Sequence, residues 1–372
     1  MARRRDKGQG GITKRADGRW QGSYHDAQGR RRYVYGVTKR AAQEQLAARL
    51  NDLRQGISLE PGRVTVAGFM ERWLRDVKAH DTERGTGQFY QDKAVYITDA
   101  LGKVLLRSLT GPMVQQLYSD LLARGLSHTT VRHTATTLKA MLAQAHRWNL
   151  VARNAAGDAK PPRAVKYQPK VLTETEVRQL LTINGQHRLY PAVAVAVTTG
   201  LRPGELRGLQ WEQVDTERRE LSVLQTVDDL PGGGWVLKVP KSERSRRTIA
   251  LGATAMAALA MQRQHQRLER MAAGPRWKDT GLVFTTSVGT PLNESNTLKL
   301  LNDMQARAGV PQTRVYDLRH THATLLLLAG IPVHVVAARL GDDPATVLRH
   351  YAHLLPTTQR EAADKFEAVL TG

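Results

Sequence analysis

The chain has 372 residues, enough for two or three domains, and its hydrophobic content of 41% is sufficient to form real cores. Lys and Arg together number 55 against 34 Asp and Glu, so the formal net charge is +21. Because so much charge of one sign repels itself, the usual partner is expected to be a polyanion. Nucleic acid is the leading candidate, and an anionic membrane surface is the alternative.

Several classes of protein and site are excluded by what the sequence lacks. The chain has no cysteine, which rules out disulfides, thiolate metal sites and thiol nucleophiles. No apolar run is long enough to span a bilayer, and the basic opening MARRRDKGQGG lacks the apolar region of a secretory signal. These features fit a protein of a reducing cytosol without a membrane partner.

Residues 1–55 predict a small sheet followed by one helix. Three short strand-like segments, ITKR, RWQGSYH and RRRYVYGV, are separated by turns that contain glycine, and Thr38 can cap the helix. The candidate DNA-binding residues of this module are Arg19, Arg30, Arg31 and Arg32. Either their sheet face enters a DNA groove together with Trp20, Tyr24 and Tyr33, or these aromatic residues pack on the helix beneath a solvated basic surface. The charge of the chain favours the groove.

Residues 64–152 predict a compact helical domain. Four amphipathic segments follow one another, VAGFMERWLRDVK, GQFYQDKAVYITDALG, PMVQQLYSDLLARG and TTVRHTATTLKAMLAQAHRWNL. Pro112 and Ser127 mark helix starts. The domain shows no catalytic constellation, but Arg132 and Lys139 are candidates for phosphate contacts. A purely structural bundle is the alternative.

Residues 153–170 hold proline, glycine and basic residues without periodicity, which is typical of a linker. Residues 171–372 then predict a domain that mixes helices with a small sheet. Thr173 and Glu176 have the spacing of a capping box, and LYPAVAVAVTTG predicts a buried helix. The segments ERRELSVLQ and WVLKVPKSERSRRTIAL alternate like strands, and further helices follow. The expected fold is therefore multidomain and mainly helical, with small β-sheets.

Two basic residues of this last domain are candidates for chemistry on a phosphate. Arg202 follows the buried helix, and Glu205, three residues on, could hold its guanidinium in place. The two residues could equally form only an ion pair at a helix start. Lys241 lies at a strand end or turn, from which a lysine can give a proton to a leaving oxygen. Taken alone, Lys241 is one basic turn residue among many.

Arg319 and Tyr351 complete the candidate set. Two arginines can neutralise the non-bridging oxygens of a phosphodiester in the ground state and in the transition state. Tyrosine is a poor nucleophile at its usual pKa of about 10. Beside a doubly liganded phosphate and a neighbouring base, however, it can form a covalent phosphotyrosyl link. Taken alone, Tyr351 is better explained as a helix-end aromatic residue with an exposed hydroxyl.

Histidines near these residues raise the question of a metal. They are His320, His322, His350 and His353. Their spacings are not those of a known helical zinc site, and no carboxylate is suitably interleaved. We therefore expect no metal and no other cofactor.

The C-terminal two hundred residues resemble the tyrosine recombinase family, the phage-type integrases. TTGLRPGEL is similar to the family's first arginine motif, which implies that Arg202 is a phosphate ligand with an acidic companion three residues on. PKSERSRRTIAL resembles the β-hairpin lysine motif, with Lys241 as general acid for the 5′ oxygen. DLRHTHATLLLLAG resembles the second arginine motif, with Arg319 and the adjacent His320. HYAHL resembles the nucleophile motif, with Tyr351. Four motifs in this order are far more specific than any one of them.

Two positions depart from the family pattern. Tyr316 stands where the family usually has histidine, and a phenol is a weaker proton shuttle at neutral pH. Asp342 stands where histidine or tryptophan commonly follows LG. An ionised acid cannot donate a hydrogen bond to the phosphate, so its other possible role is to help cap the next helix beside Asp343 and Pro344. These departures concern the expected rate more than the reaction type.

The resemblance implies a three-part integrase of a phage or another mobile element. Residues 1–55 would bind arm sites, the SAM-like domain 64–152 would bind core sites, and the mixed α+β domain 171–372 would cleave and rejoin double-stranded DNA. It implies a 3′-phosphotyrosyl intermediate, a Holliday junction and four protomers on the DNA, without metal or nucleotide. A DNA-bending host factor, a directionality factor and a place at the nucleoid in the bacterial cytoplasm are further expectations.

Three alternatives stay open at this point. A type IB topoisomerase uses the same chemistry within one duplex, although the N-terminal module argues against it. An architectural DNA-binding protein could have lost catalysis through Tyr316 and Asp342. The final segment, QREAADKFEAVL, predicts an amphipathic helix that docks either on a neighbouring protomer or on its own domain.

Overall fold

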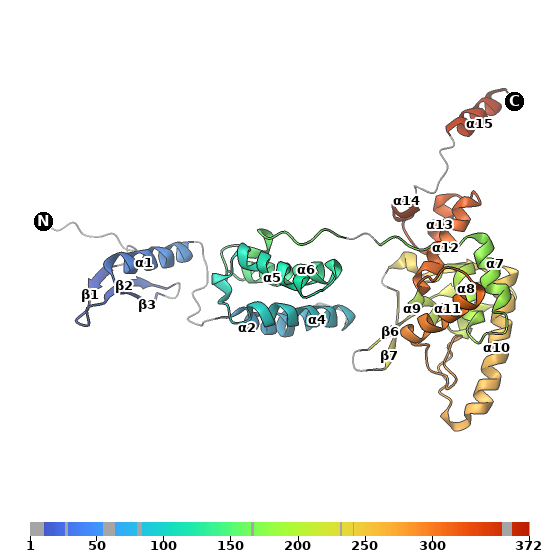
Figure 1. The fold of residues 1–372 in the computed structure, drawn as a ribbon, viewed down its shortest axis with the longest axis horizontal. Coiled ribbons are helices and arrows are strands. Elements are labelled where there is room, and N and C mark those ends of the chain that lie inside the picture. Colours follow the sequence, from blue (N-terminus) through green and yellow to red (C-terminus); the bar gives the residue numbers. More distant parts are fainter. Residues whose placement is uncertain are drawn as a thin grey trace. The chain divides into compact units, whose positions relative to one another are not determined.

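The computed structural model describes residues 11–26, 29–54, 64–79, 84–164, 167–230, 233–240, 242–351 and 359–371. The chain divides into two compact units, Met1–Lys166 and Tyr167–Gly372. The expected multidomain architecture, mainly helical with small antiparallel sheets, is confirmed (Figure 1). Lys241 and His353 lie outside the described residues.

The first unit begins with an antiparallel sheet of β1 (Gly11–Lys14), β2 (Trp20–His25) and β3 (Arg31–Gly36), followed by helix α1 (Lys39–Arg54). Alternation along the strands places Tyr24 and Val34 on the face that packs against Leu46 of α1. Thr38 accepts a hydrogen bond from the Ala41 N–H at 3.1 Å, as expected of a helix cap. The predicted strands and helix of this module are confirmed.

The helices predicted within residues 64–152 are also present. This part of the chain contains α2 (Val66–Trp73), which continues into a π-helical segment (Leu74–Lys78), and then α4 (Arg84–Leu101), α5 (Gly111–Ala123) and α6 (His128–Arg147). The buried core that these helices share includes Phe69, Trp73, Ile97, Leu117, Leu138 and Met141. Ser127 caps α6 by accepting from the Thr130 N–H at 3.1 Å, and Pro112 lies in the first turn of α5.

Part of the segment expected to be a linker belongs to this folded domain. A short 3₁₀ helix spans Ala155–Gly157, and the side chains of Ala155, Ala156 and Ala159 are buried in the same core. Three alanines within five residues are too few to establish a helical or strand period. The sequence pattern therefore gave no sign of their burial.

The second unit mixes helices with two small sheets. Its helices are α7 (Glu174–Ile183), α8 (Tyr190–Thr199), α9 (Pro203–Gly208), α10 (Ala253–Ala273), α11 (Glu294–Ala308), α12 (Val315–Leu328), α13 (Val333–Leu340), α14 (Pro344–Tyr351) and α15 (Gln359–Thr371). One sheet contains β4 (Val214–Asp215), β5 (Glu220–Val223) and β8 (Arg247–Ala250), and β6 (Thr226–Asp229) pairs with β7 (Trp235–Lys238) in another. The capping box of Thr173 and Glu176 at α7 is confirmed.

The segment WVLKVPKSERSRRTIAL crosses between these two sheets. Its first strand, β7, pairs with β6, whereas its second strand, β8, pairs with β5. The pairing of β8 with β5 places the buried side chains of Leu221 and Ile249 opposite each other. A period of two predicts a strand but does not encode which strand becomes its partner.

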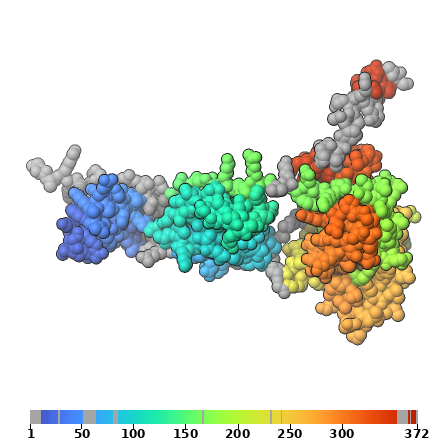
Figure 2. Space-filling model, viewed as in Figure 1, coloured from blue at the N-terminus to red at the C-terminus, as the bar shows by residue number. Residues whose placement is uncertain are grey.

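Helix α8 forms the centre of the second unit. The residues Ala192–Val197 are all buried, because α10 and α12 both pack against the helix. Such burial on all sides explains why the segment is apolar around its whole circumference. The first half of α10 covers α8 with buried residues such as Leu259, whereas its far end exposes Leu268 and Met271. This far end reaches the lower edge of the unit in the view of Figure 2.

A buried histidine joins three helices of the second unit. His322 of α12 places its Nδ1 2.9 Å from the carbonyl oxygen of Val197 in α8, and its Nε2 lies 3.0 Å from Nε of Arg339 in α13. Because arginine can only donate, Nε2 must accept and Nδ1 must carry the proton. Arg339 also donates to the carbonyl oxygens of Thr198 and Ala250. Burial, followed by the Arg339 charge, lowers the pKa of His322 from 6.5 to about 3.

We predict that this contact makes the second unit sensitive to acid. Between the ordinary pKa of 6.5 and the lowered value of about 3, the unfolded chain binds a proton at His322 that the folded chain does not. The free energy of unfolding should therefore fall as the pH falls through this window, by at most about 1.4 kcal/mol per pH unit. Urea denaturation at a series of pH values measures this slope.

The slope should become shallower in His322→Gln. The matched control is His334→Gln, which changes an exposed histidine of α13 and should keep the native slope. Identical slopes for the native protein and His322→Gln would contradict the assignment.

Candidate active site

Arg202 and Glu205 lie where the central helix ends. Gly200 terminates α8 in the left-handed region with φ 69°, and Arg202 then occupies the N-cap of α9, with Pro203 in its first turn. The Glu205 carboxylate accepts from the Arg202 backbone N–H at 3.0 Å and from its Nη1 at 2.7 Å. The contact expected from the sequence is present.

Glu205 also binds an arginine that the sequence reasoning missed. Arg247 of β8 donates from Nη2 and Nη1 to the two carboxylate oxygens of Glu205, at 2.9 and 3.1 Å. Burial raises the pKa of Glu205, but Arg247 and Arg202 together hold it below its ordinary value. Burial also lowers the pKa of Arg247. The sequence does indicate that Arg247 points inward. Side chains alternate along a strand, so Arg247 lies on the same face as Ile249, which is buried.

Arg319 is the most deeply buried of the candidate arginines, with its side chain 2% exposed. From α12 it donates to the carbonyl oxygen of Gly200 and to that of Leu340, both at 2.8 Å. These two carbonyls lie at the ends of α8 and α13, so one guanidinium fixes the place where both helices stop. Its Nη2 also reaches the carboxylate of Asp342 at 2.6 Å.

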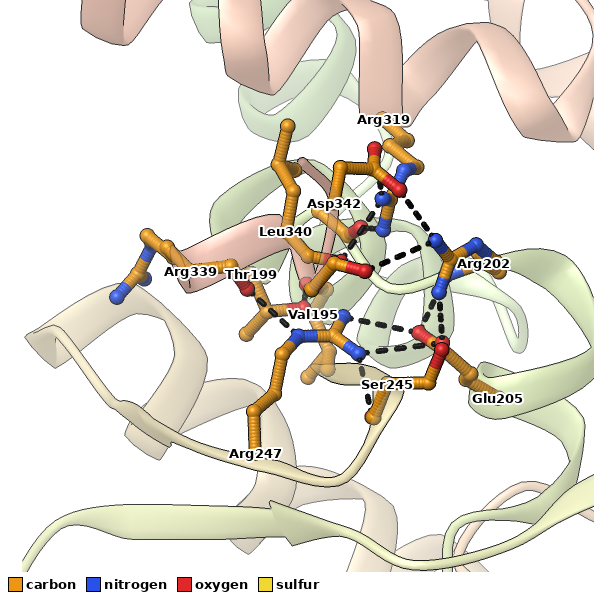
Figure 3. A network of polar contacts seen from close by, with 12 residues as sticks. Val195, Thr199, Arg202, Glu205, Ser245, Arg247, Arg319, Arg339, Leu340 and Asp342 are labelled. Atoms are coloured by element: carbon orange, nitrogen blue, oxygen red, sulfur yellow. Dashed lines mark hydrogen bonds and ion pairs between the residues drawn. The ribbon is translucent and has the colours of Figure 1, made fainter. Parts of the chain in front are cut away.

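Asp342 bridges the two arginines that were expected to hold a phosphate. Its Oδ1 lies 2.5 Å from Arg202 Nη2, and its Oδ2 accepts from Arg319 Nη2 (Figure 3). The expectation that Asp342 helps cap the next helix is wrong, because both carboxylate oxygens are engaged elsewhere. The cap of α14 is provided by Asp343, which accepts from the Ala345 N–H at 2.9 Å.

Tyr351 is buried at the end of α14, so the alternative of an exposed helix-end aromatic residue is wrong. Its side chain packs in a cluster with Leu327, Leu340 and Val347. Its hydroxyl oxygen lies 2.5 Å from Nδ1 of His320. Burial raises the pKa of the Tyr351 phenol above its ordinary value.

The other aromatic candidate, Tyr316, lies beside this pair. Its side chain is 42% exposed, and its ring centroid is 5.3 Å from that of His320. Burial lowers the pKa of His320, so its ring is neutral at neutral pH. The second unit thus brings together Arg202, Glu205, Arg319, His320, Tyr351, Tyr316 and Asp342 and adds Arg247. Lys241 lies outside the described residues.

The candidate DNA-binding arginines of the first unit have different surroundings. Arg31 is exposed, and its guanidinium lies 5.7 Å from the ring centroid of Tyr33 on the sheet face away from α1. Arg19 pairs with Asp17, and Arg30 and Arg32 pair with Asp26. Tyr24 packs against the helix, as in a purely structural sheet, whereas Tyr33 stays exposed, as expected of a face that enters a DNA groove.

The two candidates of the helical domain also differ. Arg132 of α6 donates to the carbonyl oxygen of Pro162 at 2.9 Å, which leaves its guanidinium only partly accessible. Lys139 is exposed on the same helix. Among the described residues, no group of three His, Asp or Glu side chains is arranged to hold a metal ion. No helix in the described part of the chain is long and apolar enough to cross a membrane.

Comparisons with known proteins identify the family. A model of the family described as "Phage integrase family" matches residues 170–358. A "Tyrosine recombinase XerC-like" protein of Caldanaerobacter subterraneus subsp. tengcongensis is 28% identical over 354 residues, which cover 90% of each chain. An "Integrase" of Streptomyces ambofaciens is 28% identical over 369 residues, covering 93% of this chain and 92% of that one.

Solved structures share the fold. The Tn1549 transposon integrase in complex with transposon right end DNA matches with a TM-score of 0.68 at 20% identity, over 82% of this chain and 100% of that one. A lambda integrase tetramer bound to a Holliday junction matches with a TM-score of 0.58 at 16% identity, over 92% of this chain and 96% of that one. The chain belongs to the phage integrase family and is a tyrosine-type site-specific DNA recombinase of a mobile element.

Proposed function

We propose that Arg202, Arg319, Lys241 and Tyr351 cleave and rejoin DNA through a 3′-phosphotyrosyl intermediate. The observation that carries this assignment is the convergence of two guanidiniums on one carboxylate. The Tyr351 phenol lies close enough to interact electrostatically with both Arg319 and Asp342. Two fixed guanidiniums are suited to two non-bridging phosphate oxygens, because each can donate along a defined direction.

The scissile phosphate takes the place of the Asp342 carboxylate. Both groups are anions that present two oxygens, so the phosphate can make the same contacts with Arg202 and Arg319 once the Asp342 side chain has turned away. The side chains of Arg202 and Asp342 are 28% and 23% exposed, whereas that of Arg319 is 2% exposed. The phosphate therefore enters from the Arg202 side. Asp342 keeps the two arginines neutralised and in position until DNA arrives.

The covalent step conserves the phosphodiester energy. The Oη of Tyr351 forms a bond to phosphorus, the bond from phosphorus to the 5′ oxygen breaks, and Lys241 gives that oxygen its proton. The free 5′ hydroxyl of one duplex then attacks the phosphotyrosyl link of another, through a Holliday junction. Neither a nucleotide nor a metal enters the balance of this step.

Four copies of the chain act together on the DNA in this proposal. Residues 1–55 bind arm-type sites, 64–152 bind the core site, the part of 153–170 that follows the buried Ala159 links the domains, and 171–372 perform the chemistry. The lambda integrase tetramer on a Holliday junction supports the assembly by analogy of fold. A DNA-bending host factor and a directionality factor would choose between integration and excision of the mobile element. The reaction would take place on the nucleoid in the bacterial cytoplasm.

We predict that Tyr351→Phe abolishes covalent capture of DNA while it preserves binding. The substrate is a nicked duplex that carries the repeated sequence flanking the gene, so that cleavage releases a short fragment and traps the protein. The Tyr351→Phe variant has no nucleophilic oxygen and should give no covalent complex on a denaturing gel. Tyr190→Phe, at a half-buried tyrosine of α8, is the matched control and should trap DNA at the native rate. Covalent capture by Tyr351→Phe would overturn the assignment.

We predict that Asp342→Asn tightens binding to the same duplex. The amide keeps the shape of the side chain but leaves an uncompensated positive charge that the phosphate can neutralise. An effect of roughly tenfold corresponds to about 1.4 kcal/mol. Fluorescence anisotropy at one fixed salt concentration measures it. Asp343→Asn is the control, because Asp343 pairs with Arg244 on the surface and should change the affinity less. Unchanged or weaker binding in Asp342→Asn would contradict the exchange of carboxylate for phosphate.

We predict that deleting residues 1–55 abolishes binding to distant arm-type sites but spares cleavage at the core duplex. Gel-shift titrations with the two kinds of DNA separate these effects. In the full chain, Arg31→Ala should weaken arm binding more than Arg19→Ala, because Arg19 is paired with Asp17 while Arg31 lies beside the exposed Tyr33. Loss of core cleavage in the deletion would count against this division of labour.

A further inference from the structure

The nucleophile must lose a proton when it attacks, and the structure places an acceptor against it. The Oη of Tyr351 lies 2.5 Å from Nδ1 of His320. We propose that His320 is the catalytic base that takes the Tyr351 proton during cleavage and the acid that returns it during rejoining. This inference rests on the proposed phosphotyrosyl reaction and assigns a group that the reaction requires.

His320 and Tyr351 are held together from two elements. His320 lies on α12 directly after Arg319, while Tyr351 ends α14. Leu327 of α12 and Val347 of α14 belong to the same buried cluster as the Tyr351 side chain. Because apolar packing fixes both helices, the contact is set by the fold rather than by mobile surface side chains.

Burial and the charges around His320 keep its ring unprotonated, so that it can accept a proton. Burial is the largest influence on it, and Asp317 of its own helix acts in the opposite direction. The charges of Arg319 and of His350 on α14 further disfavour protonation, whereas Asp342 favours it. A neutral ring that is protonated at Nε2 leaves Nδ1 free to accept from the Tyr351 hydroxyl.

Neighbouring groups are poorer acceptors for this proton. Asp342 is bound by both guanidiniums in the DNA-free enzyme, and once the phosphate displaces it, a carboxylate is a weaker base than a neutral imidazole. Tyr316 stands where the family usually has histidine, but a neutral phenol is a far weaker base than a neutral imidazole. Its ring flanks His320 at 5.3 Å between centroids. The base is thus one turn further along α12 than the family pattern predicts.

The proton balance of the two steps is complete. During cleavage the proton moves from Tyr351 Oη to His320 Nδ1 while Oη bonds to phosphorus, and the departing 5′ oxygen takes its proton from Lys241. During rejoining the 5′ hydroxyl attacks phosphorus and gives its proton back to the Lys241 amine. The imidazolium of His320 then returns its proton to the departing Tyr351 oxygen. The enzyme ends in its starting state.

The test compares two versions of the nicked duplex described above, one with the natural 5′ oxygen and one with sulfur at that bridging position. A thiolate, with a pKa of about 8.5, leaves without needing a proton from the enzyme. Sulfur should therefore rescue Lys241→Ala, which lacks the proposed acid. It should not rescue His320→Gln, which still lacks the base. His320→Gln should cleave both duplexes about 10²- to 10⁴-fold more slowly than the native protein while binding them equally well.

The matched control is His334→Gln, which changes an exposed histidine of α13 and should cleave at the native rate. Cleavage by His320→Gln at the native rate, or its rescue by sulfur, would overturn the role of His320 as base. If His320→Gln does not fold, cleavage by His320→Ala is measured with and without added imidazole, which should restore it. Failure of imidazole to restore cleavage counts against the proposal. A native protein that captures no DNA overturns the proposed function itself, which distinguishes the two failures.

Discussion

The site depends on the neutralisation of positive charge that has been removed from water. Arg247 and Arg319 are almost wholly buried, and Arg202 is largely so. An unpaired guanidinium in this position would be strongly destabilising, so each one requires an anion or several carbonyl oxygens. Glu205 supplies a permanent anion between Arg202 and Arg247. Asp342 supplies a second anion on the more exposed side, which is where we propose that the substrate phosphate replaces it.

Backbone carbonyls at helix ends complete this neutralisation. Arg319 binds the carbonyl oxygens of Gly200 and Leu340, where α8 and α13 end. The C-terminal end of a helix carries partial negative charge from carbonyls that have no partner within the helix. Three separate parts of the chain, the end of α8, the strand β8 and the end of α13, are therefore joined through arginine side chains (Figure 3). The proposed catalytic geometry and the packing of the second unit therefore depend on the same contacts.

Burial has a second consequence at Tyr351, the proposed nucleophile. It raises the pKa of the Tyr351 phenol, which opposes its ionisation in the absence of DNA. The same burial keeps His320 neutral beside it. In the proposed reaction, a protonated phenol next to a neutral imidazole does not attack until a phosphate is held by the two guanidiniums. In the proposed reaction, the carboxylate of Asp342 between the two arginines and the protonated state of Tyr351 thus both belong to the DNA-free enzyme.

The sequence by itself determined the local features of this protein. The apolar run of α8, the capping box at Thr173 and the motifs around Arg202, Arg319 and Tyr351 are legible because each depends on residues within a few positions of one another. Only the tertiary structure decided which distant groups meet. Arg202 and Asp342 are 140 residues apart, so no local spacing predicts that this carboxylate lies between two arginines. The contact of Arg247 with Glu205 does not follow from spacing either. Strand pairing and the contact of His320 with Tyr351 were likewise decided by packing between elements, which no local period encodes.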